Sequence, residues 1–164
     1  MTDESGKHEV TRLRNLVRRL KTDSIDSAEL VASLTENPIC TVDVDESIPC
    51  VTVIWKRYAS SLQLRFVHEK ILELLRQRNL RAVLGDDLAL PTLHAEDQRW
   101  ILGDWIPRAK EAGLTAVASR RSASHWAQIA IDSLQAELLS FVEVQSFDDW
   151  ITAREWLRTR IPRA

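Results

Sequence analysis

Residues 39–55 read ICTVDVDESIPCVTVIW, and this stretch decides the fold. The runs ICTVDV and CVTVIW are rich in β-branched residues, and the five residues DESIP lie between them. Two β-rich runs separated by a short connection that contains a proline are typical of a β-hairpin. The sheet is therefore expected to begin with an antiparallel pair of strands.

After this hairpin the sequence alternates between helical and β patterns. Helices are predicted at about 60–79, 95–112, 124–137 and 147–160, and strands at about 81–85, 114–119 and 138–144. Such alternation is typical of an α/β layer fold with a mainly parallel sheet. The sequence therefore predicts an α/β domain: a mixed sheet of about five strands, antiparallel at the hairpin and otherwise mainly parallel, with helices packed on it.

Residues 1–22 are predicted to form a tail and an amphipathic helix, followed by a single domain at 23–164. Between His8 and Lys21 the apolar residues share one helical face and the basic residues lie outside it. A basic amphipathic helix can lie on an anionic membrane or dock on a partner. The alternative is a helix that packs on the net-acidic domain or on another subunit. A short helix at 26–34 should end before Pro38, which disfavours a helical conformation for the residue before it.

The composition is that of a globular domain and excludes several classes of function. The 164 residues are 45% hydrophobic and 28% charged, with a formal net charge of -2. This balance argues against a nucleic-acid binder, whose affinity comes mainly from neutralising phosphates. No apolar run approaches the roughly 20 residues of a membrane-spanning helix, and the first ten residues contain no apolar segment. We expect a cytoplasmic protein without a membrane span.

Cys40 and Cys50 flank the predicted turn and could lie near each other across the hairpin. A structural disulfide is not expected in a reducing compartment, and two cysteines alone cannot complete a zinc site. We expect two buried thiols.

The predicted helix at 95–112 contains Gly103 and Pro107, four residues apart. Proline lacks an N–H and its ring clashes with the carbonyl four residues back, so the helix is expected to be kinked around the sheet. On a regular helix Trp105 lies on the apolar side, whereas Trp100 lies among charged residues. Trp100 is therefore a candidate for surface recognition.

Short patterns spread between residues 35 and 157 carry a resemblance to a known family. They are TENPICTVDVD, WKRY, LGDD, EDQRW, DWIPRA and SFDDWITAREWL. With the predicted element order, they make the chain similar to the SpoIIAA-like branch of the STAS superfamily, which is related in fold to the CRAL-TRIO domains that carry lipids. The resemblance implies a binding or regulatory module without an enzymatic reaction or a cofactor.

The chain departs from the family where the related antagonist proteins carry a phosphorylated serine. The segment here, DDLALPTLHAED at 86–97, contains no serine, and Thr92 is its only hydroxyl. Arg57 and His94 also stand where relatives commonly have Gly and Ser. Phosphorylation in the usual form is therefore not expected.

Two regions are candidate binding sites. For a non-catalytic regulatory module with a protein partner or with self-association, we expect the surface to include residues of the 95–112 helix and of the loop before it: Trp100, Asp104, Arg108, Asp86, Asp87, Thr92 and His94. For a carrier of a small apolar or lipid-like ligand, we expect a cavity lined by Leu64, His68, Leu72 and Trp105. His68 interrupts the apolar face of its helix, where a histidine is either hydrogen-bonded in the core or lines a cavity.

Asp86 and Asp87 directly follow a predicted buried strand, where α/β proteins place ligands. They could hold Mg²⁺ or accept a phosphoryl group, or they could pair with arginines that follow the next strand. The chain has no nucleophile elbow, no dinucleotide fingerprint and no phosphate-binding loop, and the HEK sequence after Val67 does not complete a zinc-peptidase motif. No catalytic and no metal-ligating residue is therefore nominated.

Overall fold

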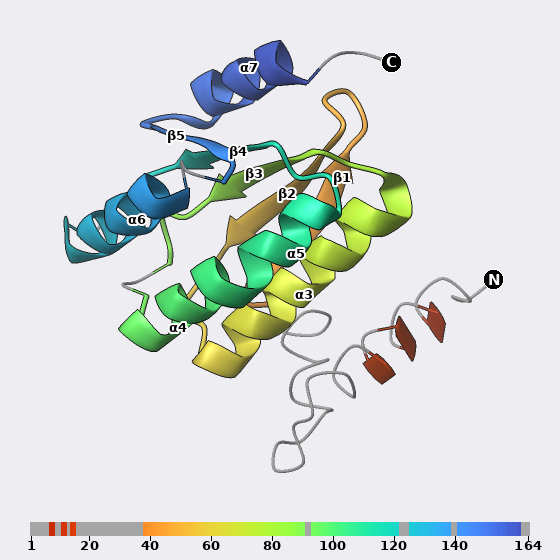
Figure 1. Ribbon diagram of the computed structural model, residues 1–164, viewed down its shortest axis with the longest axis horizontal. Helices are drawn as coiled ribbons and strands as arrows, with labels where there is room; N and C mark the ends of the chain where they lie inside the picture. Colours follow the sequence, from red (N-terminus) through yellow and green to blue (C-terminus); the bar gives the residue numbers. More distant parts are fainter. Residues whose placement is uncertain are drawn as a thin grey trace.

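The computed structural model describes residues 38–90, 93–121, 125–138 and 141–161, with positions 7, 8, 11, 12, 14 and 15. In chain order the elements are β1 (Cys40–Asp45), β2 (Cys50–Trp55), α3 (Ser61–Arg78), β3 (Ala82–Asp86), α4 (Ala95–Trp100), the π-helical turn η1 (Ile101–Trp105), α5 (Ile106–Glu111), β4 (Ala116–Arg120), α6 (His125–Leu138), β5 (Glu143–Phe147) and α7 (Trp150–Arg160) (Figure 1). The predicted helices at 8–21 and 26–34 lie almost wholly outside the described residues.

The five strands form one sheet in sequential order, β1-β2-β3-β4-β5. β1 and β2 are antiparallel and every later pair is parallel. The fold class predicted from the sequence is confirmed.

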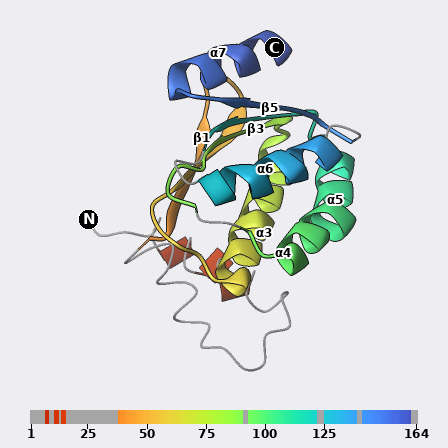
Figure 2. The ribbon, with the colours of Figure 1, turned by 90° about the vertical axis from the view of Figure 1, so that its left-hand side faces the viewer.

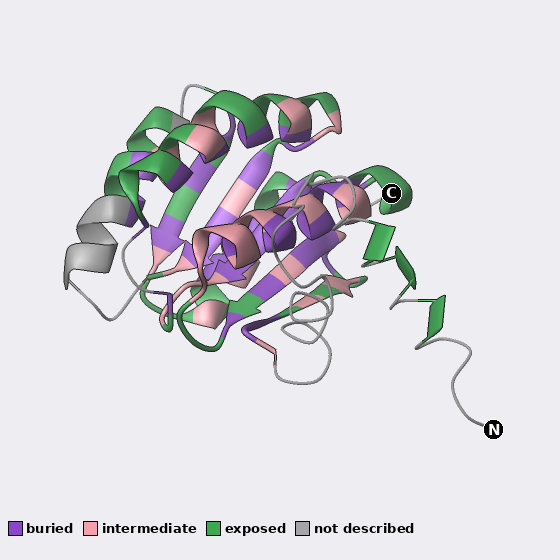
Figure 3. Ribbon diagram, turned by 90° about the horizontal axis from the view of Figure 1, so that it is seen from below, coloured by how far each residue is buried: buried purple, intermediate pink, exposed green. Residues whose placement is uncertain are grey.

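The helices form two unequal layers (Figures 1 and 2). α3, the run from α4 to α5, and α6 cover one face of the sheet, and α7 packs on β3, β4 and β5 from the other face. Right-handed crossovers between parallel strands added in one direction place their helices on one side, which explains the crowded face. Figure 3 shows these helices burying the side turned to the sheet and exposing the outer side.

The long helix α3 is well defined at both ends. Ser60 and Gln63 form a reciprocal capping box at its start. At its end Asn79 adopts the left-handed conformation, with φ of 52°. Because asparagine tolerates this conformation better than most residues, the helix stops cleanly before Leu80, which is buried under the sheet edge.

The hairpin places its two cysteines apart. Cys40 pairs with Trp55 and Cys50 pairs with Asp45, at opposite ends of the ladder. The two side chains also belong to different cores, Cys40 under α3 and Cys50 under α7. Both are free thiols, as expected, but they do not approach each other across the turn. Burial raises the pKa of each thiol to about 12.

The C-terminal boundaries differ from the sequence prediction. The strand expected at 138–144 lies at Glu143–Phe147, and the helix expected from Phe147 begins at Trp150. The apolar pair at 138–139 suggested a strand, but Leu138 ends α6. Asp149 caps α7 by accepting a hydrogen bond from the Thr152 N–H, whereas Ser146 lies inside β5.

The helix expected at 95–112 is one continuous helical run from Ala95 to Glu111, and its distortion is a π-helical turn. The Ile106 N–H bonds to the Ile101 carbonyl, five residues back. The turn spans Gly103 and ends two residues before Pro107, where the missing N–H already weakens the regular α-helical pattern. Among the described residues no helix combines the length and the apolar character that a membrane span needs.

Candidate ligand-binding cavity

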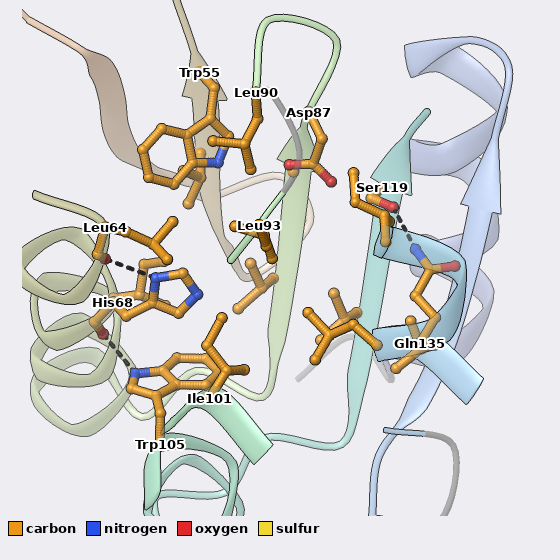
Figure 4. Close-up of a pocket in the computed structure, with 18 of the residues that line it drawn as sticks. Trp55, Leu64, His68, Asp87, Leu90, Leu93, Ile101, Trp105, Ser119 and Gln135 are labelled. Carbon is orange, nitrogen blue, oxygen red and sulfur yellow. Dashed lines mark hydrogen bonds between the residues drawn. The ribbon is translucent and has the colours of Figure 1, made fainter. Parts of the chain in front are cut away.

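A cavity of about 130 Å³ lies between the crowded face of the sheet and the helices that cover it (Figure 4). α3, η1, α6 and the loop after β3 all contribute to its walls. Most of the lining is apolar: Val53, Trp55, Leu64, Ile71, Val83, Leu90, Leu93, Ile101, Trp105, Ile106, Val117, Ile131, Leu134 and Val144. His68, Asp87, Ser119 and Gln135 are the polar residues among the described lining, and Trp55 and Trp105 add ring N–H groups.

The register of the sheet explains why this space exists. One row across the parallel strands consists of Val51, Val83, Val117 and Val144. The next row toward the carboxyl ends consists of Val53, Gly85, Ser119 and Ser146. On three of the four strands, the side chain in the second row is smaller than the one in the first row on the same face. The helices above therefore leave space unfilled at the carboxyl end of the sheet.

Gly85 has a second role, because it lets the chain place a carboxyl group at the cavity. A Cβ atom added to Gly85 would lie 3.2 Å from Oδ1 of Asp87. Alternation along the strand turns Asp87 to the cavity face and Asp86 to the opposite face. Any larger residue at position 85 would therefore compete with the Asp87 carboxyl group for the same space.

His68 projects from α3 into the cavity between two tryptophans (Figure 4). Its ring meets Trp105 edge-on at 5.0 Å between centroids and Trp100 at 6.1 Å. Nδ1 donates to the Leu64 carbonyl at 2.8 Å, and burial lowers the pKa of His68, which favours the neutral ring. Nε2 is then an acceptor, and it has no hydrogen-bond partner among the described residues.

The π-helical turn places Trp105 beside His68 in the cavity wall. Ile101, Trp105 and Ile106 all line the cavity, although residues one and five positions apart spread widely around a regular helix. The Trp105 ring N–H donates to the His68 carbonyl at 2.7 Å, which fixes η1 against α3. π-Helical turns occur frequently at functional sites.

A polar group of side chains occupies the far side of the cavity. Ser146 donates to Gln135 at 2.6 Å, and the Gln135 amide donates to Ser119 at 3.1 Å (Figure 4 shows the second bond). Burial first, and then the adjacent charge of Asp86, raise the pKa of Asp87 to about 7, and the nearby Ser119 hydroxyl opposes both by favouring the charged form. The cavity thus contains a carboxyl group that titrates near neutrality.

Replacing Asp87 with asparagine should remove a destabilisation that grows with pH. The folded chain holds the Asp87 proton up to about pH 7, whereas the unfolded chain releases it near 3.8. Because the folded state binds more protons, this group lowers the free energy of unfolding by up to ~1.4 kcal/mol per pH unit between those values. Urea unfolding from pH 4 to 8 measures the difference in the free energy of unfolding between Asp87→Asn and the wild type. This difference should grow in favour of the variant up to about pH 7 and stay constant above it.

Asp86→Asn is the matched control for this prediction. Asp86 lies on the α7 side of the sheet, where Nη1 of Arg120 approaches its carboxylate at 3.3 Å. Its substitution removes only the smaller cause of the raised Asp87 pKa, so it should reproduce less of the gain between pH 4 and 7 than Asp87→Asn does. Equal pH profiles for Asp87→Asn and the wild type would mean that Asp87 ionises in the folded chain as it does in water.

The two aspartates therefore do not act together. They point to opposite faces, and the pairing of Asp86 with Arg120 is the arginine alternative that the sequence left open. Asp97, another acidic residue near this loop in the sequence, bonds Ser61 and Arg65. No group of three or more potential metal ligands is present in the described part of the chain.

The predicted partner surface is largely engaged within the chain. Trp100 is half-buried on α3, with the Arg65 guanidinium 5.2 Å above its ring. Arg108 donates to both carboxylate oxygens of Glu69, at 2.9 and 2.5 Å, and also pairs with Asp104. Trp100 is thus partly covered by residues of α3, and the rest of its ring remains exposed. His94 is exposed before α4, and Thr92 lies outside the described residues.

Three of the four residues predicted for a cavity line it: Leu64, His68 and Trp105. Leu72 does not, since it is a buried core residue one position beyond the cavity-lining Ile71. The sequence reasoning missed the roles of Gly85, Ser119 and Gln135, and placed Asp87 on a surface. The alternation of Val83, Gly85 and Asp87 on one strand and Val117 and Ser119 on the next was the available signal.

No family model matches the chain, and no curated protein matches it significantly.

Proposed function

We propose that this chain binds a small, largely apolar molecule in the cavity beside His68. The observation that carries the proposal is the combination of unfilled apolar space with a neutral histidine whose Nε2 has no partner among the described residues. Close packing is the rule in protein interiors, and buried polar atoms are usually hydrogen-bonded. A bound molecule would both fill the space and satisfy this acceptor.

The size of the cavity limits the ligand. A volume of about 130 Å³ is close to the ~150 Å³ of an engineered apolar cavity that binds benzene or xenon. It is well below the ~300 Å³ at which ordinary ligand pockets begin. The ligand is therefore a molecule of about six to nine non-hydrogen atoms, far smaller than a membrane lipid.

Benzyl alcohol is a suitable first probe, since it combines an aromatic body with one hydroxyl donor. We expect saturable binding with a sub-millimolar Kd, measured by calorimetry, as a well-fitted ligand of about eight atoms allows. Val117→Phe should abolish this binding, because Val117 is a half-buried wall residue and the larger ring occupies the cavity.

Val42→Phe is the control for this substitution. Val42 is also half-buried on the same face of the sheet, but it does not line the cavity. Binding should survive there. Absence of saturable binding to the wild-type chain, or equal binding to Val117→Phe, would contradict the proposal.

A regulatory module of the SpoIIAA-like type is the second candidate. The observation in its favour is the mixed five-stranded sheet with its N-terminal hairpin, which agrees with the fold that the resemblance implies. Such a module acts through a protein partner or through self-association. Sedimentation over a wide concentration range tests self-association directly, and a constant monomer mass would remove that branch.

A further inference from the structure

We propose that the ligand of this cavity is a small organic amine whose ammonium group pairs with the Asp87 carboxylate and whose apolar body lies among the aromatic and aliphatic walls. This inference rests on the proposed function, since it names the chemical class that the cavity takes.

The first support is the unbalanced charge of the cavity. Asp87 is the acidic group in its lining, and the described lining residues include no lysine and no arginine. The guanidinium of Arg120 is paired with Asp86, on the other face of the sheet. The Ser119 hydroxyl near Asp87 is neutral and does not compensate a charge. An ionised Asp87 therefore needs a cation that the described lining does not supply.

The second support is that His68 and Asp87 both present acceptors to the cavity. Nε2 of His68 accepts, because Nδ1 carries the proton that bonds Leu64. The ionised carboxylate of Asp87 also accepts. A protonated primary amine is a donor with three N–H groups and no acceptor, so it complements this set better than a carbonyl compound does.

The third support is the aromatic lining. Trp55 and Trp105 lie on two sides of the space, with Asp87 on a third (Figure 4). Tryptophan faces attract organic cations through the ring quadrupole, most strongly where water is excluded. A carboxylate combined with tryptophan walls should bind an organic cation more tightly than an alcohol of equal size.

The pH dependence of binding follows from the charged groups around the cavity. His68 from α3 shares the cavity lining with Asp87 and is neutral. Asp86 is the neighbour of Asp87 in the chain, and its charge is paired with Arg120 from β4. Glu69 and Asp97 are engaged with Arg108 and Arg65. Within the cavity lining, Asp87 is thus the group whose charge changes near neutrality, at a pKa of about 7.

The test compares benzylamine with benzyl alcohol, two probes of nearly equal size, by calorimetry at about pH 6 and about pH 8. Benzylamine is protonated at both values, so only the protein changes its charge. We expect benzylamine to bind at least about tenfold more tightly than benzyl alcohol at the higher pH, the preference typical of a charge-assisted bond. Its affinity should fall about tenfold at the lower pH, where Asp87 is protonated.

Asp87→Asn is nearly isosteric and should remove the preference for benzylamine and its pH dependence while benzyl alcohol still binds. Asp86→Asn, on the opposite face, should keep both. Equal affinity of the wild type for the two probes, or an amine preference that survives in Asp87→Asn, would overturn the inference. Binding of benzyl alcohol alone would leave the proposed cavity function standing, whereas binding of neither probe would remove both.

Discussion

Replacement of Trp105 with alanine is expected to lower the free energy of unfolding by about 3–5 kcal/mol, the range typical of deleting a large buried aromatic side chain. Trp105 is only 4% exposed and packs within the main core. The substitution also removes the ring N–H that bonds the His68 carbonyl. Because the site already borders a cavity, the walls cannot easily collapse into the space that the indole leaves. Urea unfolding monitored by circular dichroism measures the change.

Trp100→Ala serves as the comparison for Trp105→Ala. Trp100 also contacts His68, but it is half-buried and its ring is covered on one side by Arg65. Its loss should cost about 1–2 kcal/mol, since less apolar area returns to water. If the two alanine variants were equally stable, Trp105 would not be the residue that joins η1 to α3.

The second large effect is expected for Asp97→Ala, which should lower the free energy of unfolding by about 2–4 kcal/mol. The substitution removes a buried carboxylate and leaves the groups that bond it without a partner. Asp97 is 2% exposed and lies between α4 and α3. It accepts a hydrogen bond from the Ser61 hydroxyl at 2.6 Å and meets Nε of Arg65 at 3.4 Å. Without it, Ser61 and Arg65 lose their bonds in a partly buried place. Thermal and urea unfolding measure the loss.

Glu96→Ala is the matched control beside it. The Glu96 side chain is 80% exposed, and its nearest approach to Arg65 is 3.7 Å. Exposed pairs of this kind contribute little, so the change should stay below about 1 kcal/mol. A similar loss in both variants would show that Arg65 needs only a nearby negative charge and not the buried carboxylate of Asp97.

The layout of the sheet could be predicted from the sequence because hydrophobic periodicity and β-branched runs report it directly. The hairpin at 39–55, the helix at 61–78 and the two strands that follow appear within two residues of their predicted places. The last strand was predicted too early in the chain because Leu138, which ends α6, begins a mostly apolar run. An apolar run alone does not distinguish the end of a helix from the start of a strand. Cooperation between distant elements decides such cases.

The candidate site was only partly predictable for a different reason. His68 could be singled out because it interrupts an apolar helical face. Trp105 could be singled out because it lies on the apolar side of its own helix. Gln135 gave no such signal, since its position depends on how α6 docks over Ser119 and Ser146. A cavity is the volume that packing leaves over, and no local pattern encodes it.

The π-helical turn means that this helix carries one residue more than an α-helix would need to join the same two ends. Such a surplus residue behaves as an insertion that the helix has absorbed without a loop. A chain shortened by this residue could fold into an uninterrupted α-helix between the same two ends, and only the side chains within the turn would be redistributed around the helix axis. Ile101 and Trp105 lie in that turn and line the cavity, so a one-residue deletion there should reshape the cavity wall while α4 and α5 keep their places.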